Sequence, residues 1–205
     1  MITKNEALEL LHANMQSVNL RKHCYAVAAV MKALAKHLSP KGRSASDLKK
    51  DEDKWEIVGI LHDGDYEKTK ETPEKHTILM TEWLKALRQA QGKKNETDKE
   101  ILEAIASHNF SHTGNNPPKN NLEWSLYCCD ELTGFIVAVT LVRPERKLSS
   151  VTVENILSKW NQKSFAAGVK REQIEKCEEK LGIKLPGFIQ IALSAMQSIS
   201  RELGL

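Results

Sequence analysis

The chain has 205 residues, of which 40% are hydrophobic and 28% are charged, and its formal net charge is +3. This composition excludes a disordered chain, and the length is sufficient for one substantial hydrophobic core. The small positive charge is spread along the sequence, so it argues against a nucleic-acid polymer as a partner.

The sequence also argues against a membrane partner. No uninterrupted apolar run reaches the roughly 18 residues of a membrane span, because the longest one, 135–142, includes Thr140. The first residues, MITKNEALELL, lack the basic leader and hydrophobic run of a secretion signal. We therefore expect a cytoplasmic protein. Its four cysteines have no CxxC spacing and are expected to be small core residues in a reducing compartment.

The periodicity of the chain predicts an all-α fold. Nearly every periodic segment repeats its apolar residues at helical spacing, and none alternates like a strand. Thr3 and Glu6 form a capping-box pattern that predicts a helix to about Met15. Asn19 is the expected cap of a second helix, and residues 39–53 are expected to be an exposed connection.

The middle of the chain contains further helix signals. A third helix is expected around 55–61, with Gly64 placed to end it. Thr72-Pro73 predicts the start of a fourth helix, and the pair Thr97 and Glu100 predicts the start of a fifth.

A sixth helix is expected from about 122 to 142, where Arg143-Pro144 ends it. Three more helices follow, with Gly182 as a stop signal. We expect residues 1–150 to form the main helical domain, and residues 151–205 to form helices that pack on it without folding independently.

Several ionisable residues are predicted to face the core. The residues that share a helix face with apolar neighbours are His23, His76, His108 and Asp130. His62 and Asp63 follow directly on an apolar run. One inward histidine is usually a satisfied core residue, but burying two carboxylates among neutral imidazoles costs several kcal/mol without a cation. A bound divalent metal is therefore the economical explanation.

The order of these residues resembles that of a known superfamily. The pattern H, then HD, then D on successive helices, here His23, His62-Asp63 and Asp130, resembles the HD superfamily of metal-dependent phosphohydrolases. More narrowly, segments such as LHDGDYE and DELTGFIVAVTLVRP resemble a subgroup of small bacterial and archaeal predicted HD-superfamily hydrolases. The resemblance implies an HD-domain-like helical bundle with a C-terminal helical extension. Gly64 departs from the leucine-like residue expected in that subgroup.

The resemblance also implies roles for the metal ligands. His23, His62, Asp63 and Asp130 would bind one divalent metal, and nitrogen and oxygen ligands suit Mn²⁺, Fe²⁺, Co²⁺, Ni²⁺, Zn²⁺ or Mg²⁺. His76 and His108 would either complete a second metal site that shares Asp63 or contact the phosphate. From the sequence, one bound metal is preferred over two.

Other residues are candidates for catalysis or for substrate binding. Asp63, Asp65 and Glu67 are the catalytic candidates, with Asp65 or Glu67 orienting a water or a ligating histidine. Arg143 and Lys147 are the candidates for binding the substrate phosphate. Lys170 and Arg171 are weaker candidates for the same role, and His112 is expected to be solvated.

The predicted function is hydrolysis of a phosphoester of a small molecule, with a nucleotide as the leading example, by a metal-activated water. A regulatory module that binds metal and nucleotide without turnover is one alternative, and a di-iron oxygenase is another. A structural zinc held by His108, His112 and one of the adjacent cysteines, Cys128 or Cys129, is a third. The sequence does not determine the oligomeric state.

Overall fold

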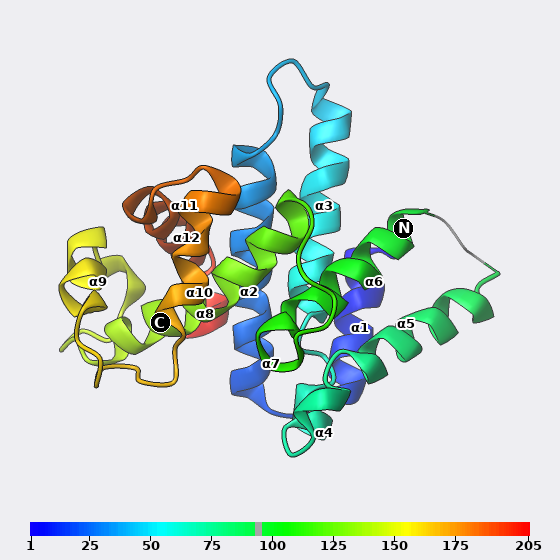
Figure 1. Ribbon diagram of the computed structural model, residues 1–205, viewed down its shortest axis with the longest axis horizontal. Helices are drawn as coiled ribbons and strands as arrows, with labels where there is room; N and C mark the ends of the chain where they lie inside the picture. Colours follow the sequence, from blue (N-terminus) through cyan, green and yellow to red (C-terminus); the bar gives the residue numbers. More distant parts are fainter. Residues whose placement is uncertain (93–95) are drawn as a thin grey trace.

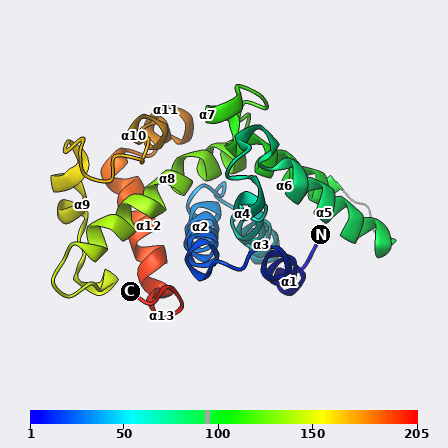
Figure 2. The same cartoon turned by 90° about the horizontal axis from the view of Figure 1, so that it is seen from below.

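The computed structural model describes residues 1–92 and 96–205, and every regular element in that part of the chain is a helix. Three long helices form the centre: α2 (Val18–His37), α3 (Ala45–Leu61) and α8 (Asn121–Leu141). Helices α2 and α3 lie side by side along their length, and α8 crosses α2 (Figures 1 and 2). The prediction of an all-α fold is confirmed.

A glycine allows α2 and α3 to pack closely. A Cβ atom on Gly59 would lie 2.4 Å from the Cα atom of Ala28 and 2.6 Å from its backbone nitrogen. No side chain fits there, so the two backbones can approach only because residue 59 is glycine. This contact places the end of α3, with His62 and Asp63, beside the part of α2 that carries His23.

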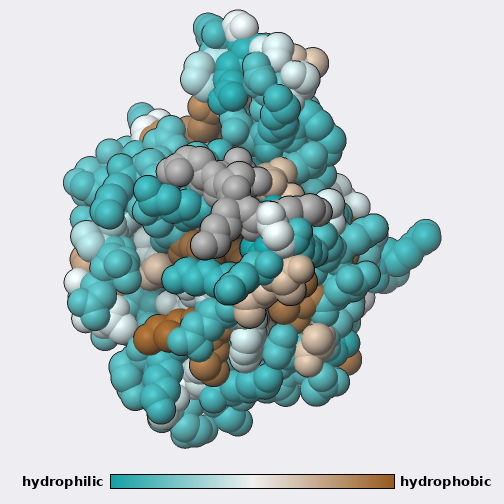
Figure 3. Space-filling view, turned by 90° about the vertical axis from the view of Figure 1, so that its right-hand side faces the viewer, coloured by the Kyte–Doolittle hydropathy of each residue, from teal (hydrophilic) through white to brown (hydrophobic). Residues whose placement is uncertain are grey.

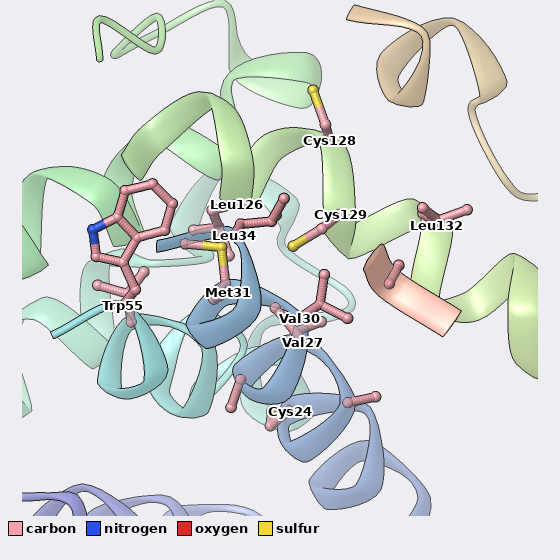
Figure 4. Close-up of a cluster of buried hydrophobic side chains, with 14 of the residues drawn as sticks. Cys24, Val27, Val30, Met31, Leu34, Trp55, Leu126, Cys128, Cys129 and Leu132 are labelled. Atoms are coloured by element: carbon pink, nitrogen blue, oxygen red, sulfur yellow. The ribbon is translucent and has the colours of Figure 1, made fainter. Parts of the chain in front are cut away.

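The three helices share one hydrophobic core. Figure 4 shows part of it, with side chains from α2, α3 and α8 packed together. Cys129 points toward α2 in this view, whereas Cys128 points away from it. All four cysteines are buried and free, as predicted from their spacing. Burying one large apolar side chain contributes about 1.5–3 kcal/mol, so this core holds the helices that carry the site.

Shorter elements extend the bundle on the side of α3. They are α1 (Lys4–Asn14), α4 (Tyr66–Thr69), η1 (Pro73–Lys75), α5 (Ile78–Ala90), α6 (Glu96–His108) and α7 (Phe110–Thr113). Helix α1 packs against α3, and α6 packs against both α3 and α8. The predicted capping box at Thr3 and Glu6 is present at the start of α1.

The C-terminal elements lie on the opposite side of α2 (Figure 2). They are η2 (Leu148–Ser150), α9 (Val153–Trp160), α10 (Arg171–Ile174), α11 (Lys176–Leu181), α12 (Leu185–Ser198) and α13 (Ser200–Leu203). Helix α12 packs on α2 and α8, and its Phe188 and Ile189 belong to the same core cluster. The division at residue 150 stays a prediction. Gly182, with φ of 68°, ends α11 as expected.

Two helix starts differ from the predictions. The side chain of Ser17, not Asn19, caps α2 by accepting a hydrogen bond from the Leu20 N–H. Ser44 caps α3 in the same way, so residues 45–53 are helical and not an exposed connection. The polar composition of that segment hid the helix, because its first turns project from the bundle and bury little apolar surface.

The starts of two further helices, α5 and α6, also differ from the predictions. Pro73 begins only the single turn η1, and α5 starts at Ile78, after Thr77 in the left-handed conformation with φ of 75°. Helix α6 begins at Glu96, ahead of the predicted cap at Thr97. The side chain of Thr97 lies outside the described part of the chain.

The surface seen in Figure 3 is mostly hydrophilic, with apolar side chains in small separate areas. Helix α8 is the one described helix long and apolar enough to span a membrane by length and composition. More than half of that stretch is buried inside the protein, and it packs against α2, α6, α10 and α11. These contacts are those of a core helix.

Candidate metal centre

The HD pair lies where α3 ends. The backbone N–H of His62 still donates to the Val58 carbonyl, and its side chain is completely buried. Asp63 follows one residue later, with a side chain that is 14% exposed. The end of a helix thus places one imidazole in the core and one carboxylate at its edge.

A first group of ligands forms between α2, α3 and α8. The Nε2 atom of His23 lies 2.9 Å from Asp130 Oδ1 and 3.5 Å from Asp63 Oδ2. The Nε2 atom of His62 lies 3.3 Å from that of His23 and 3.5 Å from Asp130 Oδ1. One donor atom from each of these four residues lies within 4.8 Å of all the others, so the group is compact enough to hold one ion.

A second group adjoins the first through Asp63. The other carboxylate oxygen of Asp63, Oδ1, lies 3.1 Å from His76 Nε2 and 3.3 Å from His108 Nε2. The two histidine Nε2 atoms are 3.0 Å apart. Each oxygen of Asp63 therefore faces a different group, which is the arrangement of a carboxylate that bridges two ions.

Hydrogen bonds fix the orientation of the three most buried imidazoles. The Nδ1 atom of His62 lies 2.8 Å from the Gly59 carbonyl oxygen, and that of His108 lies 2.7 Å from the Ile105 carbonyl oxygen. A carbonyl oxygen only accepts, so each Nδ1 carries the proton and donates. The Nδ1 atom of His76 likewise donates to the carboxylate of Asp65, at 2.7 Å. Each neutral ring therefore directs the lone pair of Nε2 at the centre.

His23 also donates from Nδ1 and directs Nε2 at the centre. Its Nδ1 atom lies 3.3 Å from the hydroxyl oxygen of Thr133. That hydroxyl has a single proton, which it donates to the backbone carbonyl of Asp130 at 2.9 Å. His23 must therefore donate from Nδ1, which leaves the Nε2 lone pair facing the carboxylates.

These orientations fit a divalent metal. With the four imidazoles neutral, the centre brings together acceptor atoms only: imidazole lone pairs and carboxylate oxygens, with nitrogen–oxygen distances of 2.9–3.6 Å. Acceptors at such distances repel one another unless extra protons or a metal ion lie between them. Histidine ligands that donate their other ring N–H to a carbonyl or carboxylate are the usual arrangement at metal sites.

In the metal-free protein, protons serve in place of the ion. Burial would lower the pKa of His23, but the hydrogen bond and charge of Asp130 outweigh burial and raise this pKa to about 9. Burial also opposes protonation of His76, but Asp63 and Asp65 raise its pKa to about 9. A metal ion must displace these protons, so metal binding is expected to release protons.

The carboxylates respond in the opposite direction. Burial alone would raise the pKa of Asp63 and of Asp130, but the surrounding imidazoles hold both pKa values well below the usual range. Burial lowers the pKa of His108, so this ring stays neutral and available as a ligand. The site thus combines ionised carboxylates with imidazoles, which suits a hard or borderline divalent cation.

Asp65 lies behind His76 and holds it in place. Its side chain is completely buried; Oδ1 accepts from His76 Nδ1 at 2.7 Å and from the backbone N–H of Thr77 at 3.1 Å. Its other oxygen accepts from the N–H of Met80 at 3.0 Å. Asp65 therefore orients a ligand, one of the two roles predicted for Asp65 or Glu67.

The ligands open into a cavity of about 390 Å³. His23, Asp63, His76, His108 and Asp130 line it, as do residues from α7 and from the segment before α10. Lys170 is the only lysine or arginine that lines this cavity among the described residues. The C-terminal part of the chain thus contributes a cation to the cavity that the candidate metal ligands line.

Hydrogen bonds hold Lys170 in this position. Its Nζ atom lies 3.1 Å from His112 Nε2 and 3.3 Å from the hydroxyl oxygen of Ser111. Its backbone N–H donates to the carboxylate of Glu131, the neighbour of Asp130. In the sequence, Lys170 stood out only as part of a basic pair in GVKRE, because no helical period connects it with Asp130.

The structure places three of the predicted site residues elsewhere. Glu67 accepts from the backbone N–H groups of Gln16 and Ser17, at the start of α2. Arg143 donates to the side chains of Ser150 and Asn155, away from the cavity. Lys147 precedes η2 and does not line the cavity. Glu67 and Arg143 make hydrogen bonds at turns, and Lys147 flanks a turn. None of the three lines the cavity.

The cysteine alternative is not supported by the geometry. Cys128 and Cys129 are buried in the core, and neither belongs to a group of potential metal ligands in the described part of the chain. His112 contacts Lys170 and not a cysteine. The ligand groups consist of histidine and aspartate alone.

The fold and this set of residues define a helical protein with His/Asp groups that could hold a metal ion, and a family comparison agrees. The family model described as HD domain matches residues 20–134, more than half of the chain. This protein therefore belongs to the HD-domain family, whose members are mostly metal-dependent hydrolases. Searches of the curated proteins and of the solved structures found no match.

Proposed function

We propose that this protein is a divalent-metal-dependent phosphohydrolase that acts on a small phosphorylated molecule. The observation that carries the proposal is the pair of ligand groups that share Asp63 at the floor of an open cavity. Two adjacent sites of this kind are typical of enzymes that cleave phosphoester bonds, because bound metals activate water and stabilise charge on the phosphoryl oxygens.

Different residues would bind each of the two ions. His23, His62 and Asp130 would hold one ion, His76 and His108 the other, and Asp63 would contact both. Asp65 keeps the His76 ring turned toward the centre, so that little reorganisation is needed when the ion binds.

Lys170 takes the role of phosphate anchor in this proposal, in place of Arg143 and Lys147. Lys170 lines the same cavity as Asp63 and Asp130. His112 and Ser111 accept two of its three N–H bonds, which leaves one for a substrate oxygen. A charge-assisted hydrogen bond to phosphate adds affinity and fixes the orientation of the ester.

A phosphatase screen tests the proposal. Protein purified without chelators is supplied in turn with Mn²⁺, Co²⁺, Ni²⁺, Mg²⁺, Zn²⁺ and Fe²⁺, and phosphate release is measured from a panel of phosphomonoesters and nucleotides. We expect metal-dependent release that chelation abolishes and metal addition restores. Thermal stabilisation by a nucleotide without any release would instead support a regulatory binding module, and two tightly bound irons with oxygen consumption would support a di-iron oxygenase.

A further inference from the structure

One face of α8 connects the metal centre with a second cavity. Asp130, Gly134, Val137 and Leu141 follow one another at spacings of four, three and four residues, so they lie on the same side of the helix. The stripe begins with a metal-ligand candidate, passes a glycine and ends in apolar side chains. Leu141, at its far end, is 48% exposed.

Gly134 has no structural reason to be glycine. It lies in the interior of α8, does not have a positive φ, and a Cβ atom added to it would meet nothing within 4 Å. Glycine in a helix interior is destabilising relative to alanine. Gly59 shows the contrast, because there a Cβ would collide with the backbone of α2. The space above Gly134 is left open at a cost to the helix.

The second cavity, of about 480 Å³, adjoins the first at this glycine. Both cavities are lined by His23 and Gly134. The second continues between α2, α8 and α13, where Ala26, Val137, Leu141 and Leu203 supply an apolar lining. Lys22 and Gly204 also line it, and the Lys22 ammonium group lies close to Gly204, since a Cβ there would be 2.8 Å from Nζ.

We infer that this second cavity binds the leaving group of the substrate, and that the substrate is a phosphomonoester of an apolar alcohol. The inference rests on the proposed function. With the phosphate between the metal ligands and Lys170, the ester oxygen points past Gly134, and the carbon skeleton enters the apolar cavity. A large side chain at position 134 would block that passage.

Binding of alkylphosphonates, which cannot be hydrolysed, tests the inference without relying on turnover. Dissociation constants of methyl, ethyl, butyl and hexyl phosphonate are measured by calorimetry on the Mn²⁺-loaded protein. Each methylene that enters an apolar cavity is expected to tighten binding about fourfold, which gives on the order of 100-fold between ethyl and hexyl. The same order of preference is expected in kcat/KM for the corresponding alkyl phosphates.

Two variants at position 134 distinguish a block of the passage from a general effect of replacing a helix glycine. Gly134→Leu should reduce the hexyl-to-ethyl ratio at least tenfold, while Gly134→Ala should raise Tm by removing a helix glycine. Gly187→Ala is the matched control, because residue 187 also lies in a helix, lines neither cavity and has room for a Cβ atom. It should keep the wild-type ratio within twofold.

The outcomes separate this inference from the proposed function. Equal affinity for all chain lengths, or a ratio unchanged in Gly134→Leu, would overturn the inference even if phosphate esters are hydrolysed. Tighter binding of nucleotides than of any alkylphosphonate would also overturn the assignment of an apolar leaving group. Chain-length-dependent binding without phosphate release in any metal would instead reject the hydrolase proposal and keep the apolar site.

Discussion

The two ligand groups that meet at Asp63 are built from different kinds of backbone. The first takes His23 from the middle of α2, Asp130 from the middle of α8 and His62 from the end of α3. The second takes His108 from the end of α6, but it takes His76 from the connection between η1 and α5, with an extended ψ of 138°. Close helix packing positions the first group and His108, whereas His76 needs a dedicated support.

That support is Asp65. A histidine outside regular structure has no helix to fix its direction. The buried carboxylate of Asp65 accepts one hydrogen bond from the His76 ring and two from the backbone N–H groups of Thr77 and Met80, and so fixes both the ring and the backbone beside it. The comparison teaches that the first group should fail when helices move apart, and the second when a single hydrogen-bonded carboxylate is changed.

The shared ligand gives the largest effect and removes both groups together. Asp63→Ala should abolish tight binding of both metals and lower kcat/KM at least about 1,000-fold, because each ion supplies several kcal/mol of charge stabilisation. Metal content by mass spectrometry and phosphate release are the measurements, with circular dichroism to check the fold. Turnover comparable with wild type would show that Asp63 is not the common ligand.

Gly59→Ala should disturb the packing of α2 against α3, which positions the first group. The new methyl would lie 2.4 Å from the Ala28 Cα atom, so α2 and α3 must separate. Overpacking of this kind costs about 1–3 kcal/mol or more, measured as a decrease in the free energy of unfolding in urea. Gly187→Ala is the control with room for the methyl, and an equal effect of both changes would contradict the close-packing argument.

Asp65→Asn should weaken the second group alone. The amide keeps the shape of the carboxylate but loses the charge that orients and polarises His76. Removing such a partner typically lowers metal affinity 10–100-fold. Calorimetric titration should therefore show one site close to wild type and one weakened site. Equal weakening of both sites would mean that the two groups are not separately supported.

Lys170→Ala should act on the substrate and not on the metals. Losing one charge-assisted hydrogen bond of about 1.5 kcal/mol should raise KM for a phosphomonoester about tenfold. Metal stoichiometry should stay at the wild-type value. Lys147→Ala removes the same charge outside the cavity and should leave KM unchanged; an identical change in both variants would assign the effect to net charge.

The smallest effect concerns Glu56, which ties α3 to α1 and α2. Its carboxylate contacts Lys4 at 2.5 Å and Lys32 at 2.7 Å. Burial opposes ionisation, but the two lysines lower the pKa of Glu56 below its usual value of 4.5. Its contribution is therefore present above about pH 4.5 and lost as pH falls through the lowered pKa.

This contribution is expected to be below about 1 kcal/mol, because the pair is partly solvated. The difference in unfolding free energy between wild type and Glu56→Gln should shrink between pH 6 and pH 3. A difference independent of pH would indicate that packing, and not charge, accounts for the effect of the substitution.

The same comparison explains how much the sequence could predict. Helical spacing predicted that His23, His108 and Asp130 face inward, because long helices keep one face on the core. It gave the right location for His76 for the wrong reason, since this residue precedes α5 instead of lying in a helix. The resemblance already allowed Asp63 to be shared between two sites, but only the tertiary structure shows that each of its carboxylate oxygens faces a different group.

Residues on connections were harder to predict. Lys170 reaches the cavity through a loop that Glu131 holds, and no periodic pattern reveals such a contact. Arg143 and Lys147 were chosen for charge and proximity to a buried helix, but turns at the end of α8 direct them elsewhere. The proposed passage at Gly134 could not be predicted from the sequence either, because it depends on the space that a missing side chain leaves open.

The proposed function depends on two metal ions that bind side by side with Asp63 between them. Anomalous diffraction from a crystal grown with Mn²⁺ counts and places these ions directly. We expect two peaks, one at His23, His62 and Asp130 and one at His76 and His108, both within coordination distance of Asp63. A single peak, or none beside Asp63 in protein never exposed to chelator, would contradict it.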